Sequence, residues 1–124
     1  MNGNKLLLDT NIIIYFLSGD LTLLALLDKK IVHISIITKL ELLSYPDISD
    51  EEVIKIENFL NNCIIIDLNP TINSKTIHLR KKYKLKLPDS IIIASSLYLD
   101  LPLLTSDKTL QKIKEVSLLY YEKY

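Results

Sequence analysis

The chain has 124 residues, of which 48% are hydrophobic, and its 15 basic and 15 acidic side chains leave no net charge. This length predicts one domain spanning residues 1–124 that buries roughly two-thirds of its unfolded surface. The single cysteine, Cys63, excludes an internal disulfide and is typical of a reducing compartment. No apolar run reaches the roughly 18 residues that cross a bilayer, so we expect a cytoplasmic protein with no membrane span or secretory signal.

The sequence pattern in the first half of the chain predicts helices alternating with short apolar strands. Ser49 and Glu52 have the spacing of a capping box, which marks the start of a helix, and Pro46 closes the helix before it. In chain order we expect a strand at 5–9, helices at 10–17 and 21–27, a strand at 31–36, a helix at 37–45 and a helix from 50 to about 61.

The second half continues the same alternation. Pro70 opens a helix, and the segment 89–99 is apolar on nearly every face, which predicts a buried helix starting around Leu87-Pro88-Asp89. We expect a strand at 63–68, a helix at 70–83, the buried helix to 99, a strand at 102–105, a short helix at 107–113 and a strand at 116–121. The alternation predicts an α/β fold, a three-layer α/β/α sandwich around a parallel sheet of about five strands.

Charge is unevenly distributed along the chain. Residues 1–62 carry 5 basic and 9 acidic side chains, whereas residues 63–124 carry 10 and 6. Half of the basic residues in the second part lie in RKKYKLK, residues 80–86. Arg80, Lys82 and Lys84 are therefore candidate RNA contacts, with Tyr83 available for stacking on a base. A solvated face of an amphipathic helix explains the same lysines equally well.

Several classes of site are excluded by residues that the chain lacks. It contains only two glycines, Gly3 and Gly19, so a glycine-rich loop that binds phosphate cannot be built. His33 and His78 stand apart from each other and from Cys63, and they do not have the spacing of zinc ligands. P-loop, dinucleotide-binding and structural zinc functions are therefore not expected.

Four carboxylates stand at or near predicted junctions between strands and helices. Asp9 ends the first strand, Asp107 follows the strand at 102–105, and Asp89 lies in the first turn of the buried helix. Glu41 lies on the helix after the second strand. Ligands of parallel sheets bind outside the carboxyl ends of the strands, so these groups could meet at one rim. Taken singly, each aspartate is also explained as a helix cap and Glu41 as a solvated helix residue.

The joint pattern resembles a known family. The segments LLLDTNIIIYFL, IITKLELL and LKLPDSIIIASSLYLDLPLLTSD occur in this order, and together they resemble the PIN domain family, especially the small VapC-type toxin ribonucleases of toxin–antitoxin pairs. Members often have glycine near the turn before the last of these strands, where this chain has Asp100. We expect this departure to affect the geometry of the turn more than the chemistry.

The resemblance implies a metal-dependent endoribonuclease. Its catalytic and metal-binding positions would fall on four residues and its supporting positions on two, namely Asp9, Glu41, Asp89 and Asp107, with Asn11 and Thr105 in support. Two carboxylates 4 Å apart repel by about 4 kcal/mol at an effective dielectric constant near 20, so such a group needs protons or a cation. Oxygen ligands suit Mg²⁺ or Mn²⁺. The resemblance also implies an RNA substrate, a homodimer and an antitoxin in a separate chain.

Two other functions compete with this hypothesis. A phosphatase of the haloacid-dehalogenase type would use Asp9 as a nucleophile, but it needs a second aspartate two residues later, where this chain has Asn11. A non-catalytic interaction module with the same fold is the other alternative. The helices at 12–17 and 21–27 carry more apolar surface than one face of a sheet needs, which favours a groove for a partner in either case.

Overall fold

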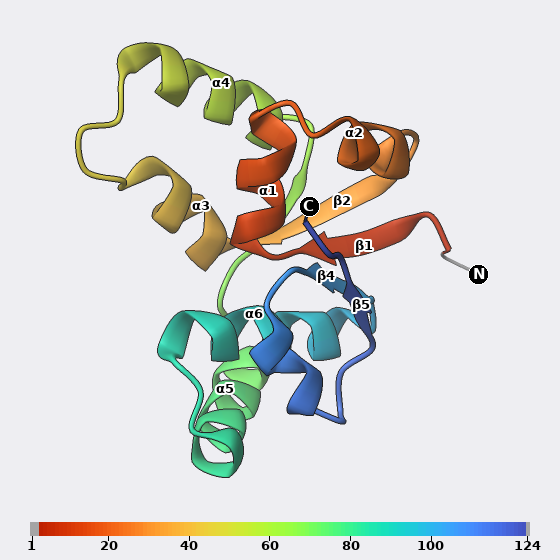
Figure 1. Cartoon of the computed structure of the whole chain (residues 1–124). Helices are drawn as coiled ribbons and strands as arrows, with labels where there is room; N and C mark the ends of the chain where they lie inside the picture. The colour runs from red at the N-terminus through yellow and green to blue at the C-terminus, as the bar shows by residue number, and fades with distance from the viewer. Residues whose placement is uncertain (1–2, 124) are drawn as a thin grey trace.

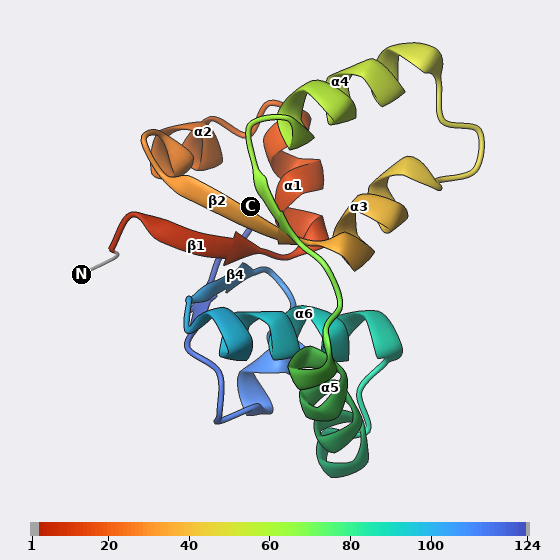
Figure 2. The ribbon, with the colours of Figure 1, turned by 180° about the vertical axis from the view of Figure 1, so that it is seen from behind.

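The computed structural model describes residues 3–123 and confirms an α/β sandwich around five parallel strands (Figures 1 and 2). The strand order is β3-β2-β1-β4-β5, and every neighbouring pair is parallel. The elements are β1 (Lys5–Leu8), α1 (Thr10–Leu17), α2 (Leu21–Leu27), β2 (Ile31–Ser35), α3 (Ile36–Leu43), α4 (Asp50–Leu60), β3 (Ile64–Ile66), α5 (Pro70–Tyr83), α6 (Leu87–Leu99), β4 (Leu103–Thr105), the 3-10 helix η1 (Lys108–Lys112) and β5 (Leu118–Tyr120).

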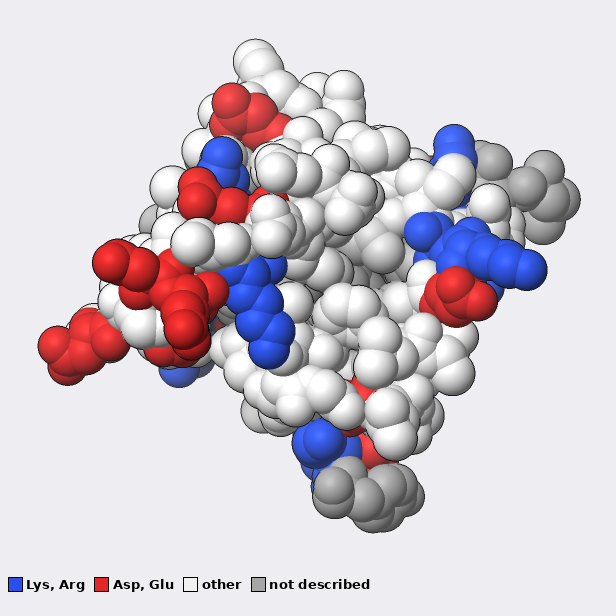
Figure 3. Space-filling model, turned by 90° about the horizontal axis from the view of Figure 1, so that it is seen from above, with Lys and Arg blue, Asp and Glu red and all other residues white. Residues whose placement is uncertain are grey.

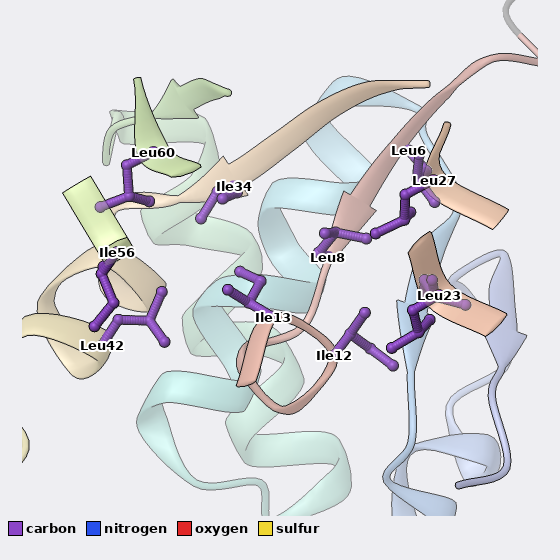
Figure 4. Packing of buried hydrophobic residues seen from close by; sticks show 11 residues of the cluster. Leu6, Leu8, Ile12, Ile13, Leu23, Leu27, Ile34, Leu42, Ile56 and Leu60 are labelled. Carbon is purple, nitrogen blue, oxygen red and sulfur yellow. The ribbon is translucent and has the colours of Figure 1, made fainter. Parts of the chain in front are cut away.

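Two hydrophobic clusters pack on opposite faces of the sheet. Helices α1 to α4 cover one face and α5, α6 and η1 cover the other (Figure 1). Leu6 and Leu8 point into the first cluster, shown in Figure 4, whereas Leu7 points into the second. This is the alternation that a strand imposes on successive side chains. Burial on both faces explains why the central strands are apolar throughout.

Local signals in the sequence set the start of most helices. Asp20 and Asn69 cap α2 and α5 with their side chains, and Pro70 takes the first position of α5, where it costs no hydrogen bond. Ser49 and Glu52 form both bonds of the predicted capping box at the start of α4. The predicted bounds of α1, α2 and α5 match those of the structure.

Some predicted bounds were wrong. Helix α3 ends at Leu43, two residues earlier than expected, because Pro46 disfavours helical backbone at Tyr45. The segment at 107–113 forms a 3-10 helix, and the strands are shorter than predicted. Asp100 has φ 53° and ψ 46° at the end of α6. It therefore keeps the left-handed turn that glycine would favour, as an aspartate can.

The first two helices bear on the question of a membrane span. Within residues 3–123, no single helix is long and apolar enough to cross a membrane. Helices α1 and α2 pass that test only when they are taken together, and the chain bends by 114° between them.

The order of the strands creates a crevice at one rim of the sheet. β1 and β4 are neighbours in the sheet. After β1 the chain enters the helical layer on one face of the sheet, whereas after β4 it enters the layer on the other face. Ile12 and Ile13 of α1 belong to the first cluster, whereas Leu110 of η1 belongs to the second. In open parallel sheets, such a divergence opens the binding crevice at the carboxyl ends of the two strands. Asp9 and Thr105 stand at those two ends.

Candidate active site

Asp9 is buried where β1 passes into α1, with only 5% of its surface exposed. One carboxylate oxygen accepts a hydrogen bond from the backbone N–H of Thr10 at 2.8 Å. The other accepts one from the hydroxyl of Thr105 at 2.6 Å, across from the end of β4. Burial is the main cause that raises the pKa of Asp9, and the charges of Asp107 and Glu41 raise it further, against these two hydrogen bonds. Asp9 is thus a helix cap and also part of a contact between strands.

Asp107 is joined to Asp9 through Thr105. The backbone N–H of Asp107 donates to the hydroxyl oxygen of Thr105 at 3.0 Å, and that hydroxyl donates onward to Asp9. One oxygen of the Asp107 side chain accepts from the backbone N–H and the hydroxyl of Thr109, at 2.9 and 2.7 Å. The capping explanation is therefore correct for Asp107 as well, and it leaves the second carboxylate oxygen without a hydrogen bond to the described residues.

Glu41 is bonded by Thr10, which in turn contacts Thr38, and neither threonine was among the predicted site residues. The hydroxyl of Thr10 donates to Glu41 Oε1 at 2.8 Å and lies 3.1 Å from the hydroxyl oxygen of Thr38. Thr38 stands one helical turn before Glu41 and is fully buried. The spacing of Thr38 from Glu41 in the sequence could have predicted that the two residues lie on one face of the helix. Nothing in the sequence predicted the bond from Thr10, which crosses from α1 to α3.

Asp89 lies in the first turn of α6 but does not cap it. The cap position is Lys86, which makes no side-chain capping bond, and no described group hydrogen bonds to the Asp89 carboxylate. Burial raises the pKa of Asp89 to about 6, and the negative charges of Asp9, Asp107 and Glu41 add to the rise. The positive charge of Lys86 opposes this rise in pKa weakly. The capping explanation therefore fails for Asp89, and its carboxylate faces three others.

The four carboxylates line one cavity of about 340 Å³. The residues lining it are Asp9, Thr10, Asn11, Glu41, Ser44, Tyr45, Pro46, Asp89 and Asp107. The structure thus brings together all four predicted acidic residues and Asn11, whose side chain is exposed. Thr105 lies behind Asp9 and supports it from the buried side. Nothing in the sequence predicted that Ser44 and Pro46 would line the cavity.

The donor set suits a hard divalent cation. Every carboxylate in the cavity contributes oxygen atoms only, which favours Mg²⁺ or Mn²⁺ over softer metals. Burial is the main cause that raises the pKa values of Asp9 and Asp89, and mutual repulsion adds to the rise; a bound cation would relieve that repulsion. Among residues 3–123, no three acidic, histidine or cysteine side chains form a ready-made ligand group. The oxygens that no described group bonds, among them both of Asp89 and one of Asp107, are the ones open to a cation.

The basic strip at residues 80–86 is partly engaged within the protein. Arg80 donates from Nε to the carbonyl oxygen of Leu85 at 3.3 Å, and Lys82 lies 3.4 Å from Glu115. The Tyr83 hydroxyl donates to the Glu115 carboxylate. Lys84 closes α5 in a left-handed conformation and is exposed. The predicted RNA contacts of Arg80, Lys82 and Lys84 stay predictions, and so does the availability of the Tyr83 ring for stacking, although its hydroxyl is bonded to Glu115.

The fold belongs to a known class of protein. Residues 6–116 match the PIN domain family. This chain belongs to the PIN domain family, as its motifs predicted. A comparison with curated proteins returned no match.

Several similar solved structures are chains of VapBC or toxin–antitoxin complexes. One, from a toxin–antitoxin complex of Klebsiella pneumoniae, is 30% identical with a TM-score of 0.79, over 95% of this chain and 99% of that one. A chain of VapBC-1 from nontypeable Haemophilus influenzae is 22% identical with a TM-score of 0.82, over 94% and 97%. A chain of VapBC2 from Rickettsia felis, bound to a promoter DNA fragment, is 22% identical with a TM-score of 0.78, over 95% and 99%. The expected likeness to VapC-type proteins is confirmed.

Proposed function

We propose that this protein is an endoribonuclease that hydrolyses phosphodiester bonds of RNA with Mg²⁺ or Mn²⁺, acting as the toxin of a toxin–antitoxin pair. The observation that carries the proposal is the convergence of four carboxylates from separate elements on one cavity. Asp89 supports it most directly, because its pKa of about 6 reflects burial and three negative neighbours with little compensation. Membership of the PIN domain family agrees with this activity.

The residues of the cavity divide into ligands and supports. Asp9 and Asp89 would be the central ligands of the ion, and Glu41 and Asp107 would complete the site directly or through water. When bound, such an ion lowers the pKa of its water and neutralises charge on the phosphate. Thr105 holds Asp9 in one orientation through its 2.6 Å hydrogen bond. Asn11, which lines the cavity with an exposed side chain, would help to orient the carboxylates.

Calorimetric titration of Mn²⁺ tests this proposal without knowledge of the substrate. We expect saturable binding by the wild-type protein and a large loss in Asp9→Asn. Asp67→Asn is the matched control, because Asp67 also follows a strand and bonds the next backbone N–H, at 2.7 Å, but it is exposed and outside the cavity. Cleavage of RNA should then depend on the metal and stop on addition of a chelator.

Absence of binding by wild-type protein with an intact circular dichroism spectrum, in the presence and absence of an RNA oligonucleotide, would count against the nuclease. The oligonucleotide is included because RNA phosphates can complete a metal site. A covalent phosphoaspartate on Asp9 would instead favour the phosphatase alternative. Binding of a partner chain without cleavage of any RNA would favour a non-catalytic interaction module.

An antitoxin in a separate chain is the proposed partner, and a homodimer is the proposed assembly. Support comes from the toxin–antitoxin complexes among the similar structures. It also comes from an apolar groove of about 510 Å³ between α1, α3 and α4, lined by Ile14, Leu42 and Ile56 among others. In Figure 3, much of the face formed by α1, α2 and α4 is uncharged, and charged side chains gather mostly toward its edges.

Helix α2 adds exposed apolar surface to that face. Leu21 is 79% exposed, and Leu24 and Leu26 are also largely exposed. Light scattering of the purified protein, alone and after co-expression with a candidate antitoxin chain, measures both assemblies. A monomer in both preparations would contradict the proposed dimer and partner.

A further inference from the structure

The acidic cavity has an aromatic side chain at its edge that the proposed chemistry leaves unexplained. Tyr45 is the single aromatic residue among those that line the cavity within the described chain, beside Glu41 and Pro46. Half of its surface, 50%, is exposed. Residues 3–123 provide no hydrogen-bond partner for its hydroxyl. Tyr45 therefore has neither the burial nor the polar contact that usually holds a tyrosine in a core.

The backbone holds Tyr45 close to the carboxylates. Helix α3 ends at Leu43, and the Ser44 hydroxyl donates to the carbonyl oxygen of Glu41 at 3.4 Å. Pro46 restricts the backbone at Tyr45 to extended conformations. The backbone N–H of Ile48 then donates to the carbonyl oxygen of Tyr45 at 3.4 Å, which closes the turn. The ring is thus attached, through one short segment, to the helix that carries Glu41.

An exposed aromatic ring next to a phosphate-handling site has a simple use. Nucleobases stack on tyrosine rings, and every base offers a face for stacking whatever its sequence. A base inside a duplex is already stacked on its neighbours, so a side chain at a cleft reaches only unpaired bases. The lining of the adjacent cavity carries carboxylates and no lysine or arginine. It therefore cannot hold the phosphates of a duplex by positive charge from its own side chains.

We propose that Tyr45 is a stacking platform for the nucleobase next to the phosphate in the acidic cavity, so that the substrate is RNA unpaired at that position. This inference rests on the proposed nuclease function and adds a residue that positions the substrate base. Tyr45 and Pro46 also line the neighbouring apolar groove. A protein segment in that groove is the competing use of the ring, and the test below separates the two.

The experiment compares Tyr45→Leu, Tyr45→Phe and Tyr98→Leu. Tyr98 is the matched control because it is also about half exposed, at 45%, but lies near the end of α6 and lines no part of the cavity. The probe is a set of short unpaired RNA oligonucleotides with 2-aminopurine at each position in turn, together with the same sequences paired in a duplex. Stacking on a ring changes the fluorescence of 2-aminopurine, and cleavage is followed in the same samples with Mn²⁺.

We expect wild-type protein, Tyr45→Phe and Tyr98→Leu to change the fluorescence of unpaired RNA at one position and to bind duplex more weakly. Tyr45→Leu should lose the signal and bind unpaired RNA about five- to tenfold more weakly, while Mn²⁺ affinity stays within twofold. In cleavage, the loss should appear in KM more than in kcat.

Two results would overturn the inference. The first is that wild-type protein changes the fluorescence of 2-aminopurine at no position of the RNA. Binding and cleavage by Tyr45→Leu that match wild type is the other, and it would leave the ring to a partner in the apolar groove. Fluorescence changes without metal-dependent cleavage would sink the nuclease proposal alone. The failure of one proposal is therefore distinguishable from the failure of the other.

Discussion

The acidic cavity and the surface cluster around Glu115 both gather charged side chains from distant parts of the chain, but they balance the charge differently. The Glu115 cluster comprises His78, Lys82, Tyr83 and Glu115. Lys82 lies 3.4 Å and His78 3.6 Å from the Glu115 carboxylate, and Tyr83 donates a hydrogen bond to it. Two of these partners, Tyr83 and Lys82, favour the charged form of this single carboxylate.

The pKa values of the two regions move in opposite directions. The hydrogen bond from Tyr83 is the main cause that lowers the pKa of Glu115, with further lowering by Lys82. Burial and three like charges raise the pKa of Asp89 to about 6. A compensated carboxylate stabilises the fold, whereas an uncompensated group costs stability and is a candidate for function. Variants of Asp89 and Glu115 test whether that distinction holds.

The largest expected difference concerns cleavage of RNA. Asp89→Asn removes a central ligand and should reduce metal-dependent cleavage by more than about 100-fold, since even outer-shell substitutions cost about 10- to 100-fold at metal sites. Glu115→Gln should stay within about twofold of wild type, because its partners lie outside the cavity. Initial rates on the same RNA at saturating Mn²⁺ give the comparison. Equal losses in the two variants would erase the distinction between the regions.

The support of Asp9 by Thr105 sharpens the comparison within the cavity. Thr105→Val removes the hydroxyl that donates to Asp9 at 2.6 Å and accepts from the Asp107 backbone at 3.0 Å, while keeping the shape. We expect Mn²⁺ affinity to fall about 10- to 100-fold, as for other residues that orient a metal ligand. Thr105→Ser keeps the hydroxyl and should bind Mn²⁺ within a few-fold of wild type. Calorimetric titration measures both, and equal affinities for the valine and serine variants would contradict this role.

The smallest effect is on the pH dependence of stability without metal. Asp89 has a folded pKa of about 6 against an ordinary value of 3.8, so the folded protein binds more protons between these values and loses stability as the pH rises through them. Asp89→Asn should therefore raise the melting temperature at pH 7.5. Partial exposure limits the gain to about 1 kcal/mol, or roughly 4 °C for a chain of 124 residues.

At pH 4, where Asp89 is largely protonated in the folded protein, the gain should nearly vanish. Glu115→Gln should act in the opposite direction at pH 7.5 and lower the melting temperature slightly, because the lowered pKa of Glu115 means that its charged form stabilises the fold. Thermal melts in the presence of a chelator give both values. A lower melting temperature for Asp89→Asn at pH 7.5 would show that the Asp89 carboxylate is compensated after all.

Much of the fold could be predicted because its signals are local. The caps at Asp20, Ser49 and Asn69 lie within three residues of the N–H groups that they bond, so the helix starts follow from short stretches of sequence. The failures were also local in cause. Proline at 46 shortened α3, and the segment after Asp107 closed as a 3-10 helix because it is short.

The sequence by itself determined the alternation of strands and helices and the four carboxylates that a PIN domain would use. Only the tertiary structure decided which of those carboxylates are compensated. Asp107 has a partner two residues away, Glu41 has one 31 residues away and Asp89 has none among the described residues, although each stood near a strand–helix junction. Likewise, Lys82 of the basic strip meets Glu115, 33 residues later. Helix caps depend on neighbours in the chain, whereas the balance of charge depends on elements that meet only after folding.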